Sequence, residues 1–319
     1  MKYTGHMRTL RVSLVLMLAA AVGAGCENSR SKLDSLPAAP NAPGDNAPAA
    51  VAADHSGSVE ERLHRLEEAH AKNAEALDFL NKVYAQQKQQ MQAQEREEHA
   101  PDAIFAVNIA EDIKIGKVDG PATAPVTIVK AFDYACPYCQ RTASTMDELV
   151  QEYQGKVRVV YKDLVVHPQV ATDAHLAACA GAKQGKYKVY KNAIWEKGFL
   201  PYAQARDPQK LAKENLLAIA KEAGLDADKI AADMTSAECK ANVDGDMAEL
   251  QKFKVNATPG FFINGIFIGG AMDKAGFKKV IDERLKIAEA SGNASNYYDA
   301  EIMTKGEKQF RSKLDPKPN

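Results

Sequence analysis

The amino-acid sequence predicts an α/β fold preceded by one long helix. From Ile104 onward, short apolar runs of strand length alternate with longer helix-forming stretches, which is typical of an α/β domain. Residues 58–99 contain long helix-forming side chains and no Gly or Pro, which predicts a single helix before that domain. Residues 27–57 are mostly Ala, Pro, Asn, Gly and Ser, so they hold too little apolar surface to fold.

The charge balance narrows the classes of partner. The chain has 319 residues, with 41 lysine and arginine residues against 42 acidic ones, for a net charge of −1. A nearly neutral chain offers no electrostatic attraction to nucleic acid or to an anionic membrane surface, so we expect no nucleic-acid partner. The apolar patterning is concentrated between residues 104 and 290, a stretch long enough to bury a core.

The N-terminus has the features of an export signal. Basic residues precede an apolar run at 12–22, which is too short to span a bilayer but suits a signal peptide. We therefore expect residues 1–25 to be removed and the mature chain to be periplasmic. Residues 23–26 resemble a bacterial lipobox, with Gly23 where leucine is preferred. Lipidation of Cys26 would anchor the protein to a membrane; the alternative is ordinary cleavage nearby, which leaves Cys26 as a free thiol.

The number of cysteines fits this interpretation. Five is an odd number for an exported chain, so one cysteine needs a separate role, and lipidation of Cys26 supplies it. The other four divide into an adjacent pair, Cys136 and Cys139, and a distant pair, Cys179 and Cys239. An oxidising compartment permits a disulfide in either pair.

Residues 26–57 are expected to form a flexible linker and residues 58–100 a coiled-coil helix. His70 and Asn73 would form a polar layer that fixes register, and Arg62 could pair with Glu67 of a parallel partner. The pattern favours a homo-oligomer without deciding between dimer and trimer. The alternatives are a solvated spacer helix and a helix folded back on the domain. The heptad a positions are Leu63, His70, Leu77, Tyr84 and Met91, and the d positions are Val59, Leu66, Asn73, Leu80 and Gln87.

Residues 101–290 are expected to form the α/β domain, with a helical insert at about 167–255 and a polar, loosely attached tail at 291–319. Asn264-Gly265 between two short apolar runs predicts a hairpin with a type I′ turn. The expected strands are Ile113–Val118, Val126–Asp133, Val157–Val166, Phe261–Ile263 and Ile266–Ile268. Outside the insert, the expected helices are Cys136–Gln154 and Asp273–Ala290.

The sequence Cys136-Pro137-Tyr138-Cys139 follows a predicted strand and opens a predicted helix. At a helix N-terminus the unsatisfied N–H groups and the macrodipole favour thiolate over thiol, so Cys136 is the candidate nucleophile. Cys139, one turn later, can attack a mixed disulfide on Cys136 and release the substrate. Pro137 suits the first helical turn, where its missing N–H would be unused. These residues predict a reversible dithiol.

A zinc site is the competing interpretation of two cysteines at this spacing. It would need two further ligands at suitable spacing, and the chain has no second C-x-x-C. His167 and His175 show no ligand spacing to these cysteines, so we expect both histidines to be packing or surface residues. We therefore expect no metal and no soluble cofactor.

Two segments together resemble the DsbA-like branch of thioredoxin-fold oxidoreductases, over about residues 104–290. They are Ala124-Pro125-Val126 leading into Phe132-Asp133-Tyr134-Ala135-Cys136-Pro137-Tyr138-Cys139, and Ala257-Thr258-Pro259-Gly260-Phe261-Phe262-Ile263-Asn264-Gly265. The resemblance implies a thioredoxin-like fold whose inserted helical domain is the stretch between the two segments. It also implies an enzyme that exchanges disulfides with protein substrates and a membrane partner that resets the dithiol.

The same resemblance assigns roles to individual residues. It implies that Pro259 is cis and faces the dithiol, and that Thr258 offers backbone hydrogen bonds to a bound peptide. Pro137 and Tyr138 would join these two in substrate contact. Relatives with cysteines at similar places often bridge them, so the resemblance also implies a structural disulfide between Cys179 and Cys239; the alternative is two separate cysteines.

One position departs from the family pattern. Many relatives carry a buried glutamate six residues before the first cysteine, and this chain has Lys130 there. If Lys130 points inward, its ammonium would lower the pKa of the Cys136 thiol, whereas an outward lysine would have little effect. The sequence leaves both orientations open.

The direction of the chemistry has three possible answers, because oxidases, isomerases and reductases share this dithiol. Tyr138, Thr258 and the predicted coiled coil resemble the disulfide isomerases DsbC and DsbG, whereas the core follows the DsbA-like disulfide donors. A DsbA-like isomerase of the ScsC type would reconcile the two, so we favour an isomerase over a disulfide donor. A hypothesis of another class is a tethered coiled-coil scaffold in which the cysteine pair is only structural.

Overall fold

A computed structural model describes residues 55–318. The chain divides into two compact units, Met1–Asp78 and Phe79–Asn319, and each is described by itself. The predicted signal segment, Cys26 and the linker as far as residue 54 lie outside the described residues.

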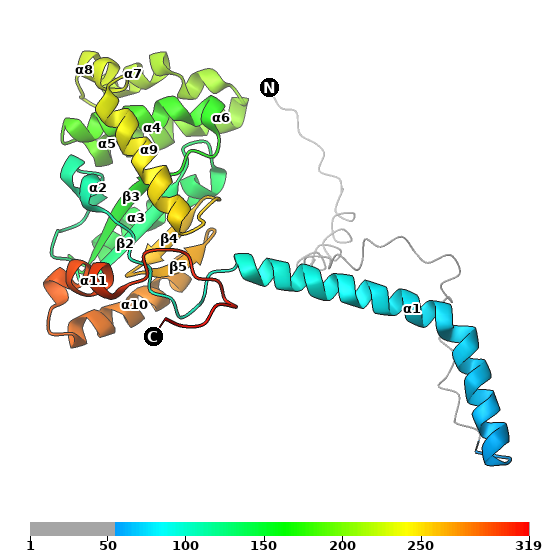
Figure 1. The fold of residues 1–319 in the computed structure, drawn as a ribbon. Helices are drawn as coiled ribbons and strands as arrows, with labels where there is room; N and C mark the ends of the chain where they lie inside the picture. The colour runs from blue at the N-terminus through cyan, green and yellow to red at the C-terminus, as the bar shows by residue number, and fades with distance from the viewer. Residues whose placement is uncertain (1–54, 319) are drawn as a thin grey trace, which may run out of the picture. The chain divides into compact units, whose positions relative to one another are not determined.

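The second unit is built around a five-stranded sheet with strand order β1-β3-β2-β4-β5 (Figure 1). The central pair β2 and β3 is parallel, and every other neighbouring pair is antiparallel. The strands are β1 Val118–Asp119, β2 Val126–Phe132, β3 Val157–Asp163, β4 Gly260–Ile263 and β5 Ile266–Gly269. This order confirms the predicted thioredoxin-like arrangement, since the helical insert lies between β3 and β4 along the chain.

The helices of the second unit fall into three groups along the chain. Before and between the first strands lie α2 Ala110–Ile115 and α3 Pro137–Glu152. The insert contains α4 Pro168–Lys183, α5 Tyr187–Ala193, η2 Ile194–Phe199, α6 Leu200–Ala205, η3 Pro208–Leu211, α7 Lys213–Glu222, α8 Ala227–Asp233 and α9 Ala237–Lys252. After the sheet come α10 Lys274–Ala290, η4 Ala294–Asn296, η5 Tyr298–Ile302 and α11 Met303–Lys305.

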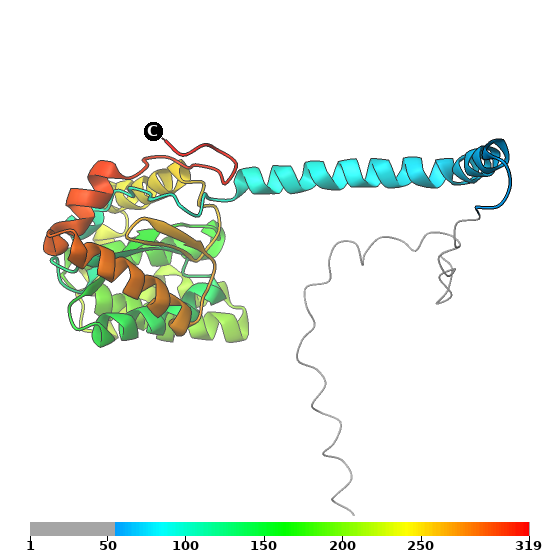
Figure 2. The ribbon, with the colours of Figure 1, turned by 90° about the horizontal axis from the view of Figure 1, so that it is seen from below.

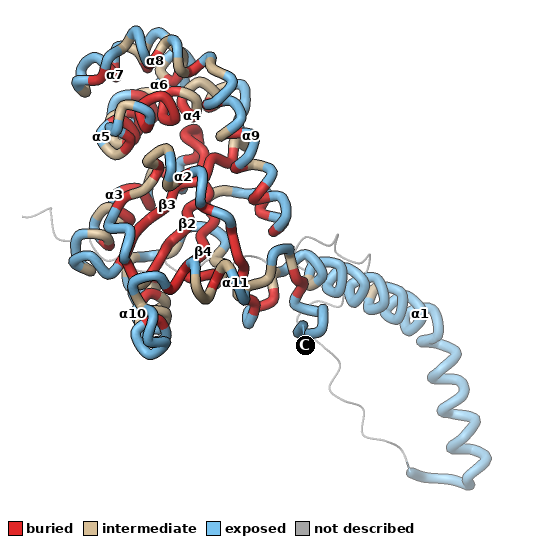
Figure 3. Tube along the Cα trace, turned by 60° about the vertical axis from the view of Figure 1, so that its left-hand side comes forward, coloured by how far each residue is buried: buried red, intermediate tan, exposed pale blue. Residues whose placement is uncertain are grey.

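The two faces of the sheet pack against different helices. Ile128 and Phe132 of β2 belong to the buried cluster that includes residues of α3 and α10, whereas Val129 and Ala131 belong to the cluster that includes the end of α9. Figure 2 shows α10 in orange. All seven residues of β2 and all seven of β3 are buried, which Figure 3 shows as continuous red strands. Lys130 has the parity of Ile128 and therefore faces α3.

The insert packs around an alanine-rich helix. The buried residues of α4 are mostly alanines, which leave little side chain between α4 and its neighbours, so helices α5, α7, α8 and α9 approach it closely. Asp207 caps η3 by accepting a hydrogen bond of 3.0 Å from the amide of Gln209, and Pro208 follows in the first turn. The predicted helical stretch between the two motif segments is confirmed.

The predicted hairpin is also confirmed. Asn264 and Gly265 both have positive φ, 41° and 85°, as a type I′ turn requires. A side chain at Gly265 would meet Cγ2 of Ile104 at 2.6 Å, because residues 104 and 105 lie directly against the turn. The Phe105 amide donates a hydrogen bond of 2.9 Å to the Gly265 carbonyl, which fixes this crossing.

Helix α1 runs from Val59 to Glu97 and has no buried residue. It begins with a capping box, in which the Ser58 amide donates to the Glu61 carboxylate at 2.7 Å and the Glu61 amide donates to the Ser58 hydroxyl at 3.3 Å. The predicted helix is therefore present, and the apolar residues of its heptad pattern are exposed. Within residues 55–318, no helix combines the length and the apolar character needed to cross a bilayer.

The strand predicted at Ile113–Val118 is wrong. Residues Ala110–Ile115 form helix α2, which has Glu111 and Asp112 in its first turn. Gly116 ends it with φ 88°, and the amides of Gly116 and Lys117 donate to carbonyls of the last turn. Only Val118 and Asp119 continue as strand β1.

The loose attachment predicted for residues 291–319 is also wrong. Tyr298 and Ile302, four residues apart, are buried on the sheet face that α9 covers, and the Tyr298 hydroxyl donates a hydrogen bond of 2.8 Å to the Val107 carbonyl. The tail is therefore packed against the domain rather than loosely attached.

The last residues of the tail contact the end of α1. The amide of Lys313 donates to the Glu98 carbonyl at 2.9 Å, and the amide of Ala100 donates to the Arg311 carbonyl at 3.0 Å. The Ser312 hydroxyl donates to the carbonyl of Glu95 at 3.1 Å. Residues 311–313 and 98–100 are therefore joined by backbone hydrogen bonds donated from both sides.

Candidate active site

Cys136 lies where β2 gives way to α3. After the strand ends, a turn is closed by a hydrogen bond of 3.1 Å from the Cys136 amide to the Asp133 carbonyl. Cys136 is the N-cap residue of α3, with an extended backbone, and Pro137 occupies the first turn. The Cys136 sulfur therefore stands at the positive end of a 16-residue helix.

Cys139 lies on the inner side of the same first turn. Its side chain is fully buried, and that of Cys136 is 4% exposed. Both are free thiols, so the structure is that of the reduced dithiol. The Cys139 amide donates a hydrogen bond of 3.1 Å to the Cys136 carbonyl, which holds the two residues in one turn.

The environment gives the two thiols opposite acidities. A hydrogen bond from the Cys139 thiol, aided by the Thr258 side chain and two backbone amides, lowers the pKa of Cys136 to about 5 against the opposing effect of burial. Burial raises the pKa of Cys139 far above its ordinary value. These environments favour the thiolate form of Cys136 and the protonated form of Cys139, its hydrogen-bond donor.

A loop from the other half of the sheet faces this pair. The Thr258–Pro259 peptide bond, just before β4, is cis. The Thr258 carbonyl lies 3.5 Å from the Cys136 sulfur, which brings together two segments 122 residues apart. The structure thus places Cys136, Cys139, Thr258 and Pro259 at one site.

A groove of about 510 Å³ opens beside the dithiol. Tyr138 forms one rim and is 53% exposed, and the guanidinium of Arg141 lies 4.4 Å from the centre of its ring. Pro137 is exposed on the same turn. The residues that line the groove are Tyr138, Arg141, Thr142, Thr258, Pro259, Gly270, Ala271 and Met272. An exposed aromatic ring next to an apolar groove suits an extended peptide.

Lys130 points inward, which decides the orientation that the sequence left open. Its side chain is 1% exposed, and its amine donates a hydrogen bond of 3.2 Å to the Cys139 carbonyl. Within residues 55–318, no carboxylate lies within ion-pair distance of this amine. Burial lowers the pKa of Lys130 to about 7.

Two residues that hold the turn before Cys136 were not predicted from the sequence. The Asp133 carboxylate accepts hydrogen bonds from the amides of Ala135, Val166 and His167 at 2.6, 2.7 and 2.8 Å. An aspartate at the end of a strand is a common turn-forming residue, so the sequence did carry a signal for it.

His175 supports the same turn from α4 and is fully buried. Its Nε2 accepts a hydrogen bond of 3.3 Å from the Tyr134 amide, and its Nδ1 lies 2.6 Å from an Asp163 carboxylate oxygen. These partners require a neutral ring with the proton on Nδ1. His175 is therefore a packing residue, as expected, but one that holds an active-site amide, and no local pattern in the sequence indicates this.

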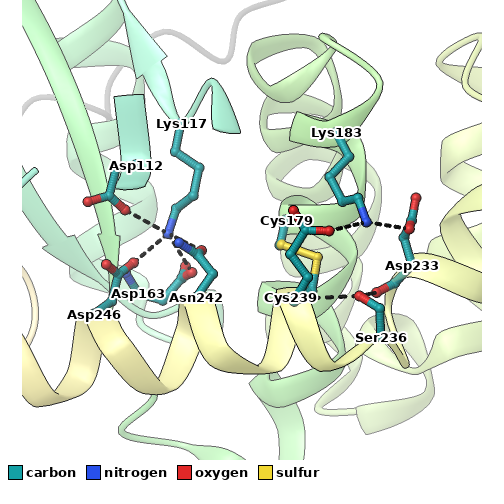
Figure 4. The surroundings of a disulfide bond; sticks show 11 residues. Asp112, Lys117, Asp163, Cys179, Lys183, Asp233, Ser236, Cys239, Asn242 and Asp246 are labelled. Atoms are coloured by element: carbon teal, nitrogen blue, oxygen red, sulfur yellow. Dashed lines mark hydrogen bonds and ion pairs between the residues drawn. A yellow bond between two sulfur atoms is a disulfide. The ribbon is translucent and has the colours of Figure 1, made fainter. Parts of the chain in front are cut away.

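Asp163, the last residue of β3, also belongs to a buried cluster of charges (Figure 4). The Lys117 amine pairs with Asp163 at 2.7 Å and with Asp246, and the Lys162 amine pairs with Asp112 at 2.6 Å and Asp246 at 2.7 Å. Burial opposes the charge on Lys117, but the surrounding carboxylates raise its pKa above the ordinary value. The cluster joins α2, β3 and α9.

Cys179 and Cys239 form a disulfide well apart from the dithiol in the chain, with an S–S distance of 2.03 Å. It joins α4 to the first turn of α9, next to the N-cap residue Ser236 (Figure 4). The sequence separation of the two cysteines is 60 residues, so the bond closes most of the insert into one loop.

The histidines considered as zinc ligands lie elsewhere. His167 is half-exposed, with Nδ1 at 3.4 Å from the Asp133 carboxylate, and both ring nitrogens of His175 have partners on the protein. Among the residues that the structure describes, no three His, Cys, Asp or Glu side chains are grouped as metal ligands.

Residues 112–283 match the protein family described as thioredoxin. The probable disulfide bond formation protein D of Bacillus cereus is 31% identical over 178 residues, which cover 52% of this chain and 77% of that protein. The Na(+)/H(+) antiporter NhaA of Herminiimonas arsenicoxydans is 28% identical over 181 residues, or 57% of this chain. The chain spans 27% of the length of that antiporter.

Among solved structures, a thioredoxin-like oxidoreductase from Silicibacter pomeroyi DSS-3 is 30% identical, with a TM-score of 0.47. The match covers 53% of this chain and 91% of the other.

Proposed function

The chain belongs to the thioredoxin family, and we propose that it is an exported disulfide isomerase that acts through Cys136 and Cys139. The family and the relative from Bacillus cereus support the thiol-disulfide oxidoreductase activity predicted from the Cys-Pro-Tyr-Cys and Thr-Pro segments. The proposed substrates are proteins that carry cysteines or disulfides.

The opposite acidities of the two thiols carry the assignment of roles. The Cys136 thiolate attacks one sulfur of a substrate disulfide, forms a mixed disulfide and releases the other substrate sulfur as a thiolate. In isomerisation, a substrate thiolate then attacks the mixed disulfide and forms the corrected bond, which returns Cys136 as a thiolate. In reduction, Cys139 attacks Cys136 instead, and the same steps run backwards when the protein donates a disulfide. An acidic Cys136 is also a good leaving group, which suits repeated exchange.

The cis-proline loop and the groove would orient the substrate during attack. The Thr258 carbonyl lies 3.5 Å from the Cys136 sulfur, and Thr258 and Pro259 line the groove in which a peptide backbone would lie. Tyr138 and Pro137 lie exposed at the entrance, where they can contact side chains that flank the substrate cysteine.

Isomerisation rather than donation is supported by the exposed side chains of α1. Leu63, Leu66, Leu77, Leu80 and Tyr84 are 43–68% exposed and follow the heptad a and d positions. A helix of 39 residues with no buried residue would gain most of its stability by packing against copies of itself. Assembly would bring several dithiols to one misfolded substrate.

Export and anchoring are supported by the sequence at residues 1–26 and by the cysteine pairing. With Cys136 and Cys139 as a dithiol and Cys179 and Cys239 bonded, Cys26 is the remaining cysteine. A lipid on Cys26 would tether the enzyme to a bacterial membrane and leave the helix and domain free to meet substrates. A membrane partner would then set the redox state of the dithiol.

The test compares a variant that disrupts the α1 seam with a matched control in the mature full chain. Leu66→Asp with Leu80→Asp places charges at two d positions, whereas Ala71→Asp places one at an outer b position. All three side chains are exposed, so neither variant disturbs the domain. Each protein is examined for molar mass and for reactivation of a scrambled, disulfide-bonded protein in glutathione buffer.

We expect the wild type and Ala71→Asp to be oligomers that reactivate the scrambled protein. The double variant should be a monomer that loses reactivation but still oxidises a reduced substrate. If the wild type fails to reactivate the scrambled protein and all three oxidise reduced substrate equally, the enzyme is a disulfide donor. If Cys136→Ser leaves every activity intact, the scaffold hypothesis replaces both.

A further inference from the structure

Lys130 is a buried amine that the exchange steps described above do not use. It lies in the middle of β2, between Tyr161 of β3 and Phe261 of β4 in the sheet register. Its amine lies 5.9 Å from the centre of the Phe261 ring and donates one hydrogen bond, to the Cys139 carbonyl. A lysine in this setting needs a reason, because burying a charged amine without a counter-ion is costly.

The other buried lysines of the second unit all have carboxylate partners. Lys191, also 1% exposed, contacts Asp147 at 3.1 Å and the Tyr161 hydroxyl at 2.9 Å. Lys117 and Lys162 pair with the three aspartates of the buried cluster. Such partners hold the proton on the amine, whereas Lys130 is free to release it.

Cys139 has the complementary requirement. To attack a mixed disulfide on Cys136 it must lose its proton, yet it is fully buried in the reduced protein. The groups that act on its acidity are the Cys136 sulfur, the Asp133 amide and Lys130. A backbone amide cannot accept a proton at neutral pH. The Cys136 sulfur carries no charge once it is bonded to substrate. Lys130 is the remaining base near the thiol.

We propose that Lys130 carries the proton of Cys139 during disulfide exchange. In resolution of the mixed disulfide, the neutral amine takes the proton from the Cys139 thiol. The Cys139 thiolate then bonds to the Cys136 sulfur, and the bond from Cys136 to substrate breaks to release a substrate thiolate. In the reverse direction, Cys139 leaves as a thiolate and takes the proton back from the Lys130 ammonium.

The electrostatics of the site agree with this geometry. Four titratable groups face the Lys130 amine: Cys136, Cys139 and Asp147 from α3, and Lys191 from α5. Burial and the Lys191 charge lower the pKa of Lys130, and the carboxylate and the two sulfurs oppose them, for a value of about 7. Both protonation states are therefore populated near neutral pH, as proton transfer requires. The inference assumes that Cys136 and Cys139 are the reacting pair of the proposed function.

The test resolves the two steps with an aromatic disulfide, 5,5′-dithiobis(2-nitrobenzoic acid), in a stopped-flow instrument. Reduced protein should release thionitrobenzoate in two phases, first by attack of Cys136 and then by attack of Cys139 on the mixed disulfide. The rate of the second phase is measured between pH 5 and 9 in the wild type, in Lys130→Met and in Lys191→Met. Lys191→Met is the matched control, because it removes an equally buried amine that already has a carboxylate partner.

In the wild type, the second-phase rate should rise with pH and level off above a midpoint near 7. Lys130→Met should lose this plateau and slow the second phase at least tenfold at pH 7, with the first phase at that pH within twofold of wild type. Lys191→Met should keep the plateau and move its midpoint to higher pH, because a positive charge next to Lys130 is removed.

A second phase in Lys130→Met that keeps both its rate and its midpoint would overturn the proposal. Loss of the plateau in Lys191→Met would also overturn the proposal, since removal of either buried lysine near the dithiol would then have the same effect. A different result would concern the proposed function itself: if the wild type releases a single thionitrobenzoate per chain, Cys136 and Cys139 do not react as a pair.

Discussion

Buried lysines on opposite faces of one sheet are treated in opposite ways. Lys162 of β3 lies on the α9 face and contacts the carboxylates of Asp112 and Asp246 at 2.6 and 2.7 Å. Lys130, diagonally across on β2, lies on the α3 face and contacts a backbone carbonyl. The Lys162 ammonium contacts two carboxylates, whereas the Lys130 amine has no counter-ion among the described residues. The paired charge of Lys162 stabilises the fold, whereas the unpaired amine of Lys130 is the one that we propose takes part in disulfide exchange.

The contrast predicts that removing the paired charge has the largest effect. Lys162→Met leaves three buried aspartates to share the single ammonium of Lys117, and should lower the free energy of unfolding by about 3–5 kcal/mol. Chemical denaturation at pH 7 measures it. Lys156→Met removes a lysine that is 53% exposed and pairs with Glu289, and should change stability by less than about 1 kcal/mol. Equal losses in the two variants would mean that the cluster has no special role.

Removing the unpaired charge should have the opposite sign. Lys130→Met replaces a buried amine with an apolar side chain of similar length, and should raise the free energy of unfolding by about 2 kcal/mol at pH 6. A destabilised variant would indicate that the amine has a partner that neutralises it.

The same variant sharpens the comparison through pH. Burial lowers the pKa of Lys130 from 10.5 in the unfolded chain to about 7 in the folded one. Between these values the unfolded state binds more protons, so the stability of the wild type rises with pH. The advantage of Lys130→Met should therefore be complete below pH 7 and shrink as pH rises towards 10.5. Denaturation curves of both proteins at pH 6, 8 and 9.5 measure this trend.

His175 links the turn before Cys136 to the buried charge cluster, and its substitution should show a smaller effect. His175→Phe keeps a ring of similar shape but removes both nitrogens, which leaves the Tyr134 amide without a partner and costs about 1–2 kcal/mol of stability. The second readout is the redox potential of the dithiol, which should shift because the turn before Cys136 loses a support. The control His167→Phe removes only a half-exposed ring contact of 3.4 Å to Asp133 and should change both measurements less than His175→Phe does.

Several of these features could be predicted from the sequence because they are local. A few neighbouring residues predict the structure in two places. These are Cys136-Pro137-Tyr138-Cys139 at a strand–helix junction and Asn264-Gly265 between two apolar runs. The heptads of α1 likewise predict a helix, and the helix is present from Val59 to Glu97. Local patterns sufficed to predict the α/β class and the helix that begins at the cysteine pair, whereas the thioredoxin-like fold was implied by the resemblance of two segments to a known family.

The features that could not be predicted depend on tertiary contacts or on misleading local patterns. The orientation of Lys130 was undecided because β2 is buried on both faces, so its sequence shows no alternation that marks one face as solvent. His175 acts through Tyr134 and Asp163, which lie in other elements. The alternation Ile113-Lys114-Ile115 imitates a strand, and the left-handed turn at Gly116 that ends helix α2 outweighs it.

The fastening of residues 311–313 to residues 95–100 makes the two edges of the domain a single cooperative unit. The Ala100 amide donates to Arg311 and the Lys313 amide donates to Glu98, so we expect the two segments to open together. Their hydrogens should exchange with deuterated solvent at matching rates, although 213 positions separate them in the chain. Fraying of the carboxyl end by a protease or an affinity tag should therefore speed hydrogen exchange at the Ala100 amide.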